Sequence, residues 1–338
     1  MGTSSTFSTS NTHVKYNITV NQNSQNVSNN CSNVSVYVRF WRDNSGYTTY
    51  GSGTCYCKIN GTTYSATVSP SQKITDSGIN LFSKTLDIYH NNDGTKTLTC
   101  SAWISMDTPL SSSEQSYSQT LSTIPRASKP TLSSSSVTMG NSVTISTNRA
   151  SSSFTHSLYY QIGSGGWNTI GTGIGTSKSW TVPLSLANST PNSTSLSVKL
   201  WLETYNGSTY IGANSVSLTA NVPSSVVPTI NSVNLSEAVS GIYAQFGAYV
   251  QGKSKISGSI SASGSYSSTI SSYSTSINGA SYTSSSFTTG FLTTSGSNTC
   301  SVTVKDSRGR TKSQSVTFNV VAYANPAINS FSVSRCDQ

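Results

Sequence analysis

The chain has 338 residues, of which 9% are charged and 34% hydrophobic, and its formal net charge is +9. This length exceeds one ordinary domain and fits roughly three. Most other residues are Ser, Thr, Asn and Gly, but 18 Tyr, 9 Phe and 5 Trp supply more aromatic surface than a disordered chain carries. No long stretch repeats apolar residues at helical spacing, so the composition argues against a helical protein and predicts an all-β protein of many short strands.

Residues 1–125 are predicted to form one larger β-sandwich that is jelly-roll-like. Residues 21–30 are polar and predict a loop. The expected strands are short and separated by turn residues such as Asn60-Gly61, and they cover residues 14–20, 34–41, 54–59, 63–68, 81–90, 96–104 and 115–123. Strands in this number and at this spacing are typical of a sandwich.

The alternation of side chains is clearest in residues 34–41. The even-numbered residues are apolar and predict the core face, which leaves the odd-numbered residues, Trp41 among them, on the opposite face. The same rule places Trp103 opposite the apolar face of the strand 96–104. Both tryptophans are therefore expected to point away from the core.

Three prolines recur at a spacing of 98 residues, at positions 130, 228 and 326. Each ends a linker and precedes an alternation of small polar and apolar residues, so each marks the start of a module. We predict two immunoglobulin-like β-sandwiches, residues 126–225 and 226–323, each about as long as such a sandwich usually is. Residues 324–338 are then the opening strand of a further, incomplete module, and the natural protein is expected to be longer.

Strand signals inside the two modules are uneven. They are clearest at the end of the second unit and the end of the third. The expected strands cover residues 142–146, 154–162, 167–170, 195–203, 216–220, 299–304 and 315–321. Residues 254–282 consist almost wholly of Ser, Gly, Tyr and Ile, so their strand register is not predicted.

The positive charge lies in the modules. Residues 1–125 hold seven Lys or Arg against six Asp or Glu, whereas residues 126–225 hold five against one and residues 226–324 six against two. Such dilute charge argues against a nucleic-acid partner. Its densest stretch, residues 305–312, is interpreted as a hairpin tip with solvated charges, and contact with an acidic wall polymer is the alternative.

The N-terminus has neither the basic nor the apolar region of a signal peptide, and no stretch is apolar enough to span a membrane. We therefore expect the protein to be made in a cytoplasm and either to stay there or to leave by lysis or assembly, with no membrane partner. No module has the cysteine pair of an antibody-type domain.

Four cysteines, Cys31, Cys55, Cys57 and Cys100, fall in the first domain. Four thiolates can bind zinc, but these lack the paired spacing of a zinc site. Cys100 also lies between apolar residues of one strand face. The prediction is that these cysteines are small buried apolar residues, with no metal and no cofactor, and zinc is the alternative.

Catalytic residues are not predicted. Ten carboxylates are scattered along the chain and the three histidines are isolated. A glycosidase needs two carboxylates across a cleft, and a serine hydrolase needs a nucleophile at a strand-to-helix turn; neither pattern is marked here. The protein is therefore expected not to be an enzyme.

Aromatic residues outside the core face are the candidate ligand-binding residues. Trp41 and Trp103 are joined by Tyr47 and Tyr50 in the loop after the first of them. A flat ring matches the apolar face of a pyranose, and neighbouring hydroxyls supply hydrogen bonds, so the predicted ligand is a glycan. The alternative is that each ring covers a sheet edge or packs on the next domain.

Several short motifs resemble, in the same order, those of minor structural proteins in the tails of siphophages, the long-tailed phages, of Gram-positive bacteria; they are residues 24–30, 90–96, 122–128, 152–156, 304–309 and 330–336. The resemblance implies a virion protein at the tail tip or baseplate, present as a homo-oligomer or in many copies and contacting other tail proteins. It supplies no catalytic residues. Family members usually continue past Arg335-Cys336.

The combined prediction is a tail-tip, baseplate or tail-fibre protein that assists adhesion to carbohydrate of the host cell wall. The first alternative is a purely structural spacer or decoration of the tail without a ligand. The second alternative is a depolymerase of wall polymers.

Overall fold

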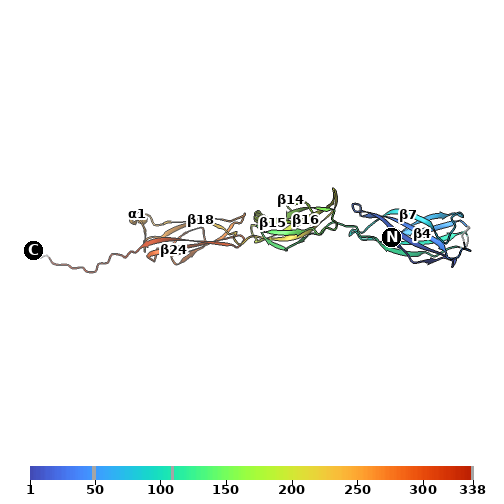
Figure 1. The fold of residues 1–338 in the computed structure, drawn as a ribbon. Helices are drawn as coiled ribbons and strands as arrows, with labels where there is room; N and C mark the ends of the chain where they lie inside the picture. The colour runs from blue at the N-terminus through green and yellow to red at the C-terminus, as the bar shows by residue number, and fades with distance from the viewer. Residues whose placement is uncertain (48–50, 108–109, 336–338) are drawn as a thin grey trace.

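The computed structural model describes residues 1–47, 51–107 and 110–335. Three β-sandwiches follow one another along an extended rod, and the C-terminal segment trails from the last of them (Figure 1). Within these residues, helix is confined to the single turn α1 (Ile242–Phe246) and the 3-10 turn η1 (Leu184–Ser189). No helix in the described chain has the length and apolar character needed to cross a membrane. The predicted all-β fold of tandem sandwiches is confirmed.

The first sandwich is built from two sheets. The first sheet joins β1 (Gly2–Thr3), β3 (Val14–Asn26), β4 (Cys31–Arg42) and β7 (Ile79–Tyr89), with β2 (Phe7–Ser8) also paired to β3. The second sheet has the order β6 (Thr62–Val68), β5 (Gly53–Ile59), β8 (Thr97–Met106) and β9 (Gln115–Thr120).

The second sandwich pairs a three-stranded sheet with a five-stranded one. The smaller sheet has the order β10 (Thr131–Leu132), β12 (Ser142–Ser146) and β15 (Ser177–Thr181). The larger has the order β11 (Ser136–Thr138), β17 (Thr209–Asn221), β16 (Ser195–Asn206), β13 (Phe154–Ile162) and β14 (Asn168–Ile174).

The third sandwich repeats this arrangement strand for strand. Its smaller sheet has the order β18 (Thr229–Glu237), β20 (Ile256–Ser263) and β23 (Ser286–Thr288). Its larger sheet has the order β19 (Tyr249–Val250), β25 (Thr311–Val321), β24 (Gly296–Asp306), β21 (Ile270–Ile277) and β22 (Ala280–Tyr282). In both modules the short first strand of the larger sheet runs parallel to the last strand.

The first sandwich uses the same strand order as the two modules. Its sheet β9-β8-β5-β6 corresponds to β17-β16-β13-β14, and its β3-β4-β7 corresponds to β10-β12-β15. The predicted β-sandwich is therefore confirmed, with connections that are immunoglobulin-like rather than jelly-roll-like.

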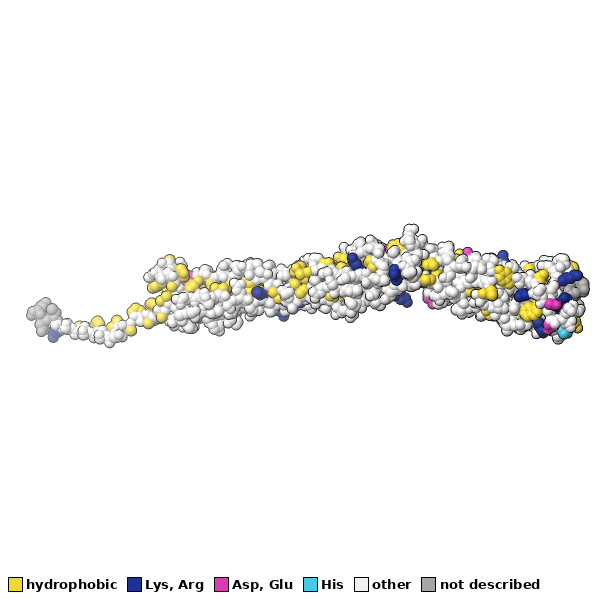
Figure 2. All heavy atoms as spheres, in the orientation of Figure 1, with side chains coloured by type: hydrophobic (Ala, Val, Ile, Leu, Met, Phe, Trp, Pro, Cys, Tyr) yellow, Lys and Arg dark blue, Asp and Glu magenta, His cyan; other side chains and the backbone are white. Residues whose placement is uncertain are grey.

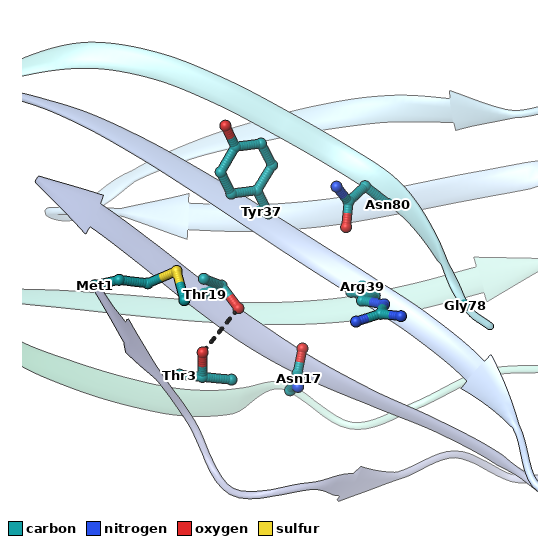
Figure 3. A pocket seen from close by; sticks show the side chains of 8 residues that line it. All are labelled: Met1, Thr3, Asn17, Thr19, Tyr37, Arg39, Gly78 and Asn80. Atoms are coloured by element: carbon teal, nitrogen blue, oxygen red, sulfur yellow. Dashed lines mark hydrogen bonds between the residues drawn. The ribbon is translucent and has the colours of Figure 1, made fainter. Parts of the chain in front are cut away.

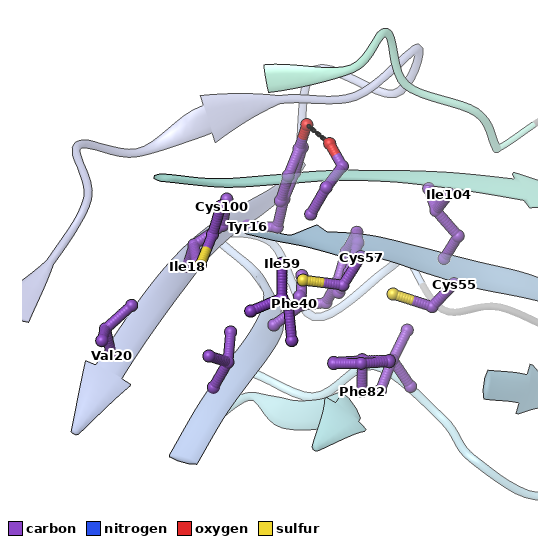
Figure 4. Packing of buried hydrophobic residues seen from close by; sticks show 14 of the residues in the cluster. Tyr16, Ile18, Val20, Phe40, Cys55, Cys57, Ile59, Phe82, Cys100 and Ile104 are labelled. Carbon is purple, nitrogen blue, oxygen red and sulfur yellow. Dashed lines mark hydrogen bonds between the residues drawn. The ribbon is translucent and has the colours of Figure 1, made fainter. Parts of the chain in front are cut away.

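Strand β4 shows the side-chain alternation predicted for it. Val34, Val36, Val38 and Phe40 are fully buried. The Phe40 ring stacks on Tyr16 of β3, with ring centroids 4.9 Å apart, and Figure 4 shows both within the packed interior. The Tyr16 hydroxyl donates to a backbone carbonyl of β8 at 3.1 Å, so the one polar atom of this ring is satisfied by the opposite sheet.

Strand β3 is longer than predicted, because it continues to Asn26 through residues that were expected to form a loop. Amide side chains hold this extension. Gln22 Nε2 donates to Ser32 Oγ at 2.8 Å, and Gln25 Nε2 donates to the Ser122 carbonyl at 2.7 Å. Hydrogen bonds replace apolar contacts here, so hydrophobic periodicity carries no signal for the strand.

An arginine links the first two sandwiches. Arg126 Nη1 donates to the Val27 carbonyl of the first sandwich at 2.8 Å, and Nη2 donates to the Ile211 carbonyl of the second at 3.3 Å. Because one guanidinium is rigid and planar, these two bonds fix the two sandwiches relative to each other.

Two arginines link the second and third sandwiches. Arg308, only 7% exposed, donates to the carbonyls of Thr190 at 3.0 Å and Ala187 at 2.7 Å, both in the second sandwich. Arg310 Nη2 donates to the Val222 carbonyl at 2.7 Å. The interpretation of this hairpin as a tip with solvated charges is therefore wrong for both arginines, because the end of the preceding sandwich covers them.

The segment after β25 forms no strand among residues 322–335. Figure 2 shows hydrophobic side chains along the trailing segment. Its apolar side chains Ile328, Phe331 and Val333 are 86%, 84% and 79% exposed. Their spacing matches that of the half-buried apolar residues of β18. The assignment of residues 324–338 to the start of a further module stays a prediction, and residues 336–338 lie outside the described chain.

Candidate functional site

A pocket of about 490 Å³ opens on the outer face of the first sheet of the first sandwich (Figure 3). The inward side chains of β3 and β4 form the core, so the outward ones line this surface. The lining residues are Met1, Thr3, Asn17, Thr19, Tyr37, Arg39, Gly78 and Asn80.

Strand pairing brings the polar groups of this pocket together. Asn17 of β3 and Asn80 of β7 both pair with Arg39 of β4, and Thr19 pairs with Tyr37. Two amides, a guanidinium, a hydroxyl and a phenol thus converge on one concave surface. Such a set offers both donors and acceptors, which is what hydroxyl-rich ligands require.

Two groups of the pocket differ in how they are held. The Arg39 guanidinium donates to the Ser77 carbonyl, which fixes its orientation at the rim. The Asn17 Oδ1 atom is shielded and has no hydrogen-bond partner within the described chain. Leaving an acceptor unpaired and shielded costs free energy.

The structure places Trp41 on this same outer face, two residues beyond Arg39 in β4 and half-buried. Tyr47 follows in the next loop, is 41% exposed, and stacks on His13 with ring centroids 4.4 Å apart. Tyr50, the fourth predicted residue, lies outside the described residues. The Trp41 end of the sheet thus carries two of the predicted aromatic residues.

Trp103 lies elsewhere. It belongs to β8 in the second sheet, where it stacks on the cross-strand neighbour Tyr56 with ring centroids 5.0 Å apart. The outer faces of the two sheets of a sandwich point in opposite directions. Trp41 and Trp103 therefore do not form one aromatic surface, and a ligand stacked on one ring does not reach the other.

The sequence pattern missed the polar residues of the pocket. Alternation in β3 would have placed Asn17 and Thr19 outward, but only the pairing of β3 with β4 sets them beside Arg39 and Tyr37. The position of Asn80 was even harder to predict from the sequence, because the register between β4 and β7 shifts at Val38 and Arg39.

The cysteines of the first sandwich pack in its core. Cys55, Cys57 and Cys100 are fully buried among apolar side chains (Figure 4), while Cys31 is buried outside that cluster. Within the described residues, no three metal-ligating side chains gather as a metal site. Burial raises the pKa of Cys55 and Cys100 to about 12 and raises that of Cys57 as well, so these thiols stay protonated at neutral pH.

We expect these thiols to resist alkylation in the folded protein. At pH 8 a raised pKa leaves almost no thiolate, which is the reactive form, and burial blocks access. Iodoacetamide followed by peptide mass spectrometry should leave Cys55, Cys57 and Cys100 unmodified until denaturant is added. Rapid labelling of any of them in the native protein would contradict the core assignment.

Two carboxylates of the first sandwich serve local structure. Asp93 Oδ1 accepts from the Thr95 amide at 3.0 Å and from its hydroxyl at 2.7 Å, and the Thr95 side chain is the main reason that the pKa of Asp93 is lowered. Asp87 accepts from the Asn33 amide at 2.9 Å. These acids shape a turn and tie two strands, and neither lines the pocket.

Comparison with solved structures finds matches of low similarity. The fibronectin(III)-like modules of Clostridium thermocellum CbhA are 14% identical, and the match covers 60% of this chain and 100% of that one with a TM-score of 0.24. A bacterial ice-binding adhesin involved in host cell surface retention is 16% identical over 88% and 93%, with a TM-score of 0.29. Protocadherin gamma B2 cadherin domains 3–6 are 12% identical over 92% and 76%, with a TM-score of 0.34. These scores are too low to support any statement about function.

No curated protein matches the chain. A family model does match, over residues 5–338, and its description is "Siphovirus protein of unknown function (DUF859)". That match spans nearly the whole chain and agrees with the motifs that resemble siphophage structural proteins. The chain therefore belongs to this siphovirus protein family.

Proposed function

We propose that this siphovirus protein is a virion component of the tail tip or baseplate and that it assists adhesion to carbohydrate of the host cell wall. The observation that supports adhesion is the pocket of Figure 3, where two amides, a guanidinium and a phenol converge. Trp41 lies two residues beyond Arg39 on the same face of β4. Sugar hydroxyls would bond to the polar groups, and a pyranose face would stack on the aromatic ring.

The proposed binding is weak at each site and strong in the assembly. A shallow polar pocket on a sheet face contributes few desolvated contacts, so one copy binds loosely. Many copies on one tail would raise the overall affinity by orders of magnitude, since each later contact forms at high effective concentration. The proposed partners are thus other tail or baseplate proteins, further copies of this chain and a wall glycan, with no catalytic step.

Binding to host cell walls tests this proposal. Purified protein, as a monomer and displayed in many copies, is incubated with sedimented walls. We expect Trp41→Ala or Arg39→Ala to weaken binding by about tenfold, which corresponds to about 1.4 kcal/mol. Trp103→Ala is the matched variant on the opposite sheet and should leave binding unchanged. Failure of every oligomeric form to bind walls or glycans would refute the adhesion proposal.

A structural spacer is the second candidate, and the buried arginine contacts between sandwiches favour it. A rod whose junctions are fixed can hold other tail proteins at a set distance. In that case the outer face with Trp41 is covered by a partner in the virion. Phages carrying Trp41→Ala would then assemble defective tails, whereas the adhesion proposal expects intact tails that adsorb poorly.

A further inference from the structure

The second sandwich carries a pair of tryptophans whose rings lie outside its hydrophobic core. Trp201 lies on β16 among outward side chains, and Trp167 lies in the turn between β13 and β14. Neither ring belongs to the buried cluster of this sandwich or to the side chains packed against it. Trp180, by contrast, is only 8% exposed and stacks on Tyr160 inside that cluster.

The two rings form one surface with a lysine. Their centroids are 5.8 Å apart, and Trp167 is 44% exposed. Lys199, two residues before Trp201 on the same strand face, places its Nζ atom 5.7 Å from the Trp167 ring and 5.5 Å from the Trp201 ring. Attraction of the ammonium to both ring faces holds the three side chains together. We call them the Trp167–Lys199–Trp201 platform.

Hydroxyl and amide groups border the platform. Ser215 pairs with Trp201 and Ser217 pairs with Lys199 on one side, and Gln161 pairs with Lys199 on the other. Both serines are exposed. A flat aromatic floor with hydrogen-bonding groups at its edges is suited to a sugar ring, whose apolar face stacks while its hydroxyls point sideways.

The charge of the platform selects among sugars. Neither ion pair of the described structure includes Lys199. The nearest acid along the strand, Glu203, accepts a hydrogen bond from the Tyr205 hydroxyl at 2.8 Å. Residues 126–225 carry five basic side chains against this one acidic residue. An anionic group on the ligand would therefore meet an ammonium with no carboxylate partner.

We propose that the platform binds an anionic glycan, with a sugar ring stacked on Trp167 and Trp201 and a phosphate or carboxylate paired with Lys199. The site is separate from the pocket of the first sandwich and rests on the proposed function only in placing this glycan on the host wall. The phosphate of a teichoic acid and the carboxylate of a uronic acid offer the same contact to Lys199.

Titration with defined polymers tests this inference on the full chain. The probes are a purified teichoic acid, a polysaccharide containing uronic acid, and neutral dextran of similar length. We expect either or both anionic polymers to bind and dextran to bind at least about tenfold more weakly, and binding should weaken as salt is raised. The stronger anionic polymer identifies phosphate or carboxylate as the favoured group. Equal binding of dextran, or of no polymer, would overturn the proposal.

Substitutions in the platform test whether the anionic polymer binds there. Trp167→Ala and Lys199→Gln should each weaken binding of the anionic polymer by about five- to tenfold, and Lys199→Gln should also reduce its salt dependence. Tyr89→Ala and Lys178→Gln are matched controls, an exposed ring on the first sandwich and an exposed lysine on the other sheet of the second.

The outcomes separate this inference from the proposed function. Unchanged polymer binding by Trp167→Ala and Lys199→Gln overturns the platform, even if walls are still bound through the Trp41 face. If Trp167→Ala and Lys199→Gln weaken polymer binding, the platform is supported, even if the unchanged protein does not bind host walls. Variants that bind polymer normally but assemble defective tails would show that a protein, not a glycan, covers the platform.

Discussion

Replacing Arg308 with alanine is expected to loosen the rod between the second and third sandwiches and to lower stability there by about 2–4 kcal/mol. The guanidinium is almost fully buried and donates to backbone carbonyls on both sides, Thr190 and Ala187 in the second sandwich and Ser265 at 2.7 Å in the third. Within the described residues, the Thr190 carbonyl then has no donor unless the junction opens to water, whereas the Ala187 and Ser265 carbonyls each keep a backbone amide donor. Opening the junction removes the constraint on the angle between the sandwiches.

Small-angle X-ray scattering and thermal unfolding together measure this effect. The variant should show a broader distribution of interatomic distances and an earlier first unfolding transition. Arg308→Lys should resemble the alanine variant in scattering, because an ammonium keeps the charge but cannot reach the same set of carbonyls. Lys312→Ala is the control, since Lys312 lies on the same hairpin and is exposed. Scattering and unfolding identical to those of the unchanged protein would refute the junction's role.

The turn that carries Arg308 shows why its role at the junction could not be predicted from the sequence. Asp306 is 1% exposed, and its Oδ1 atom accepts from the backbone amides of Arg308 at 3.0 Å and Arg310 at 2.9 Å. Along the sequence these are charged residues at every second position, which ordinarily predict a solvated turn. Only the contact with the preceding sandwich turns them into an interdomain clamp, and periodicity carries no information about that contact.

The strands in the serine- and glycine-rich middle of the third sandwich could not be predicted for a different reason. Ile256 and Ile260 of β20 are buried, as alternation requires, but the residue between them on that face is Gly258. A Cβ atom at Gly258 would lie 2.1 Å from the Phe287 ring. The Phe287 ring fills the space that a side chain at position 258 would occupy. Because the core residue at this position is a glycine, a hydrophobic pattern cannot reveal it. Where the core is made of apolar side chains, as in residues 34–40 of β4, the pattern predicted every inward residue.

The candidate site was predicted only as far as single-strand alternation reaches. Alternation placed Trp41 and Trp103 outward, and both lie on outer sheet faces. It does not say which sheet a strand joins, so it could not show that the two rings face opposite directions. It also gave no weight to Trp167 and Trp201, whose proximity depends on the turn between β13 and β14.

Gly94 is the residue at which a single added methyl group is expected to do most damage in the first sandwich. It ends the turn that joins β7 to β8, with a φ of +84°, and its carbonyl accepts from the Ile124 amide at 2.9 Å and from His90 Nδ1 at 2.7 Å. The linker to the second sandwich is thus bound directly to this turn. A Cβ atom at Gly94 would lie 2.0 Å from the Ile124 carbonyl oxygen.

Gly94→Ala should therefore lower the stability of the first sandwich by about 3 kcal/mol or more, and Gly61→Ala supplies the matched control. Gly61 has a φ of +91° in another hairpin, but a Cβ there meets nothing within 4 Å. Its alanine variant carries the backbone strain alone, about 1 kcal/mol. At Gly94 the backbone oxygen cannot move aside without breaking hydrogen bonds that hold the linker. Hydrogen exchange of β7 and β8 peptides in urea measures both variants, and equal losses would show that the linker contact contributes nothing.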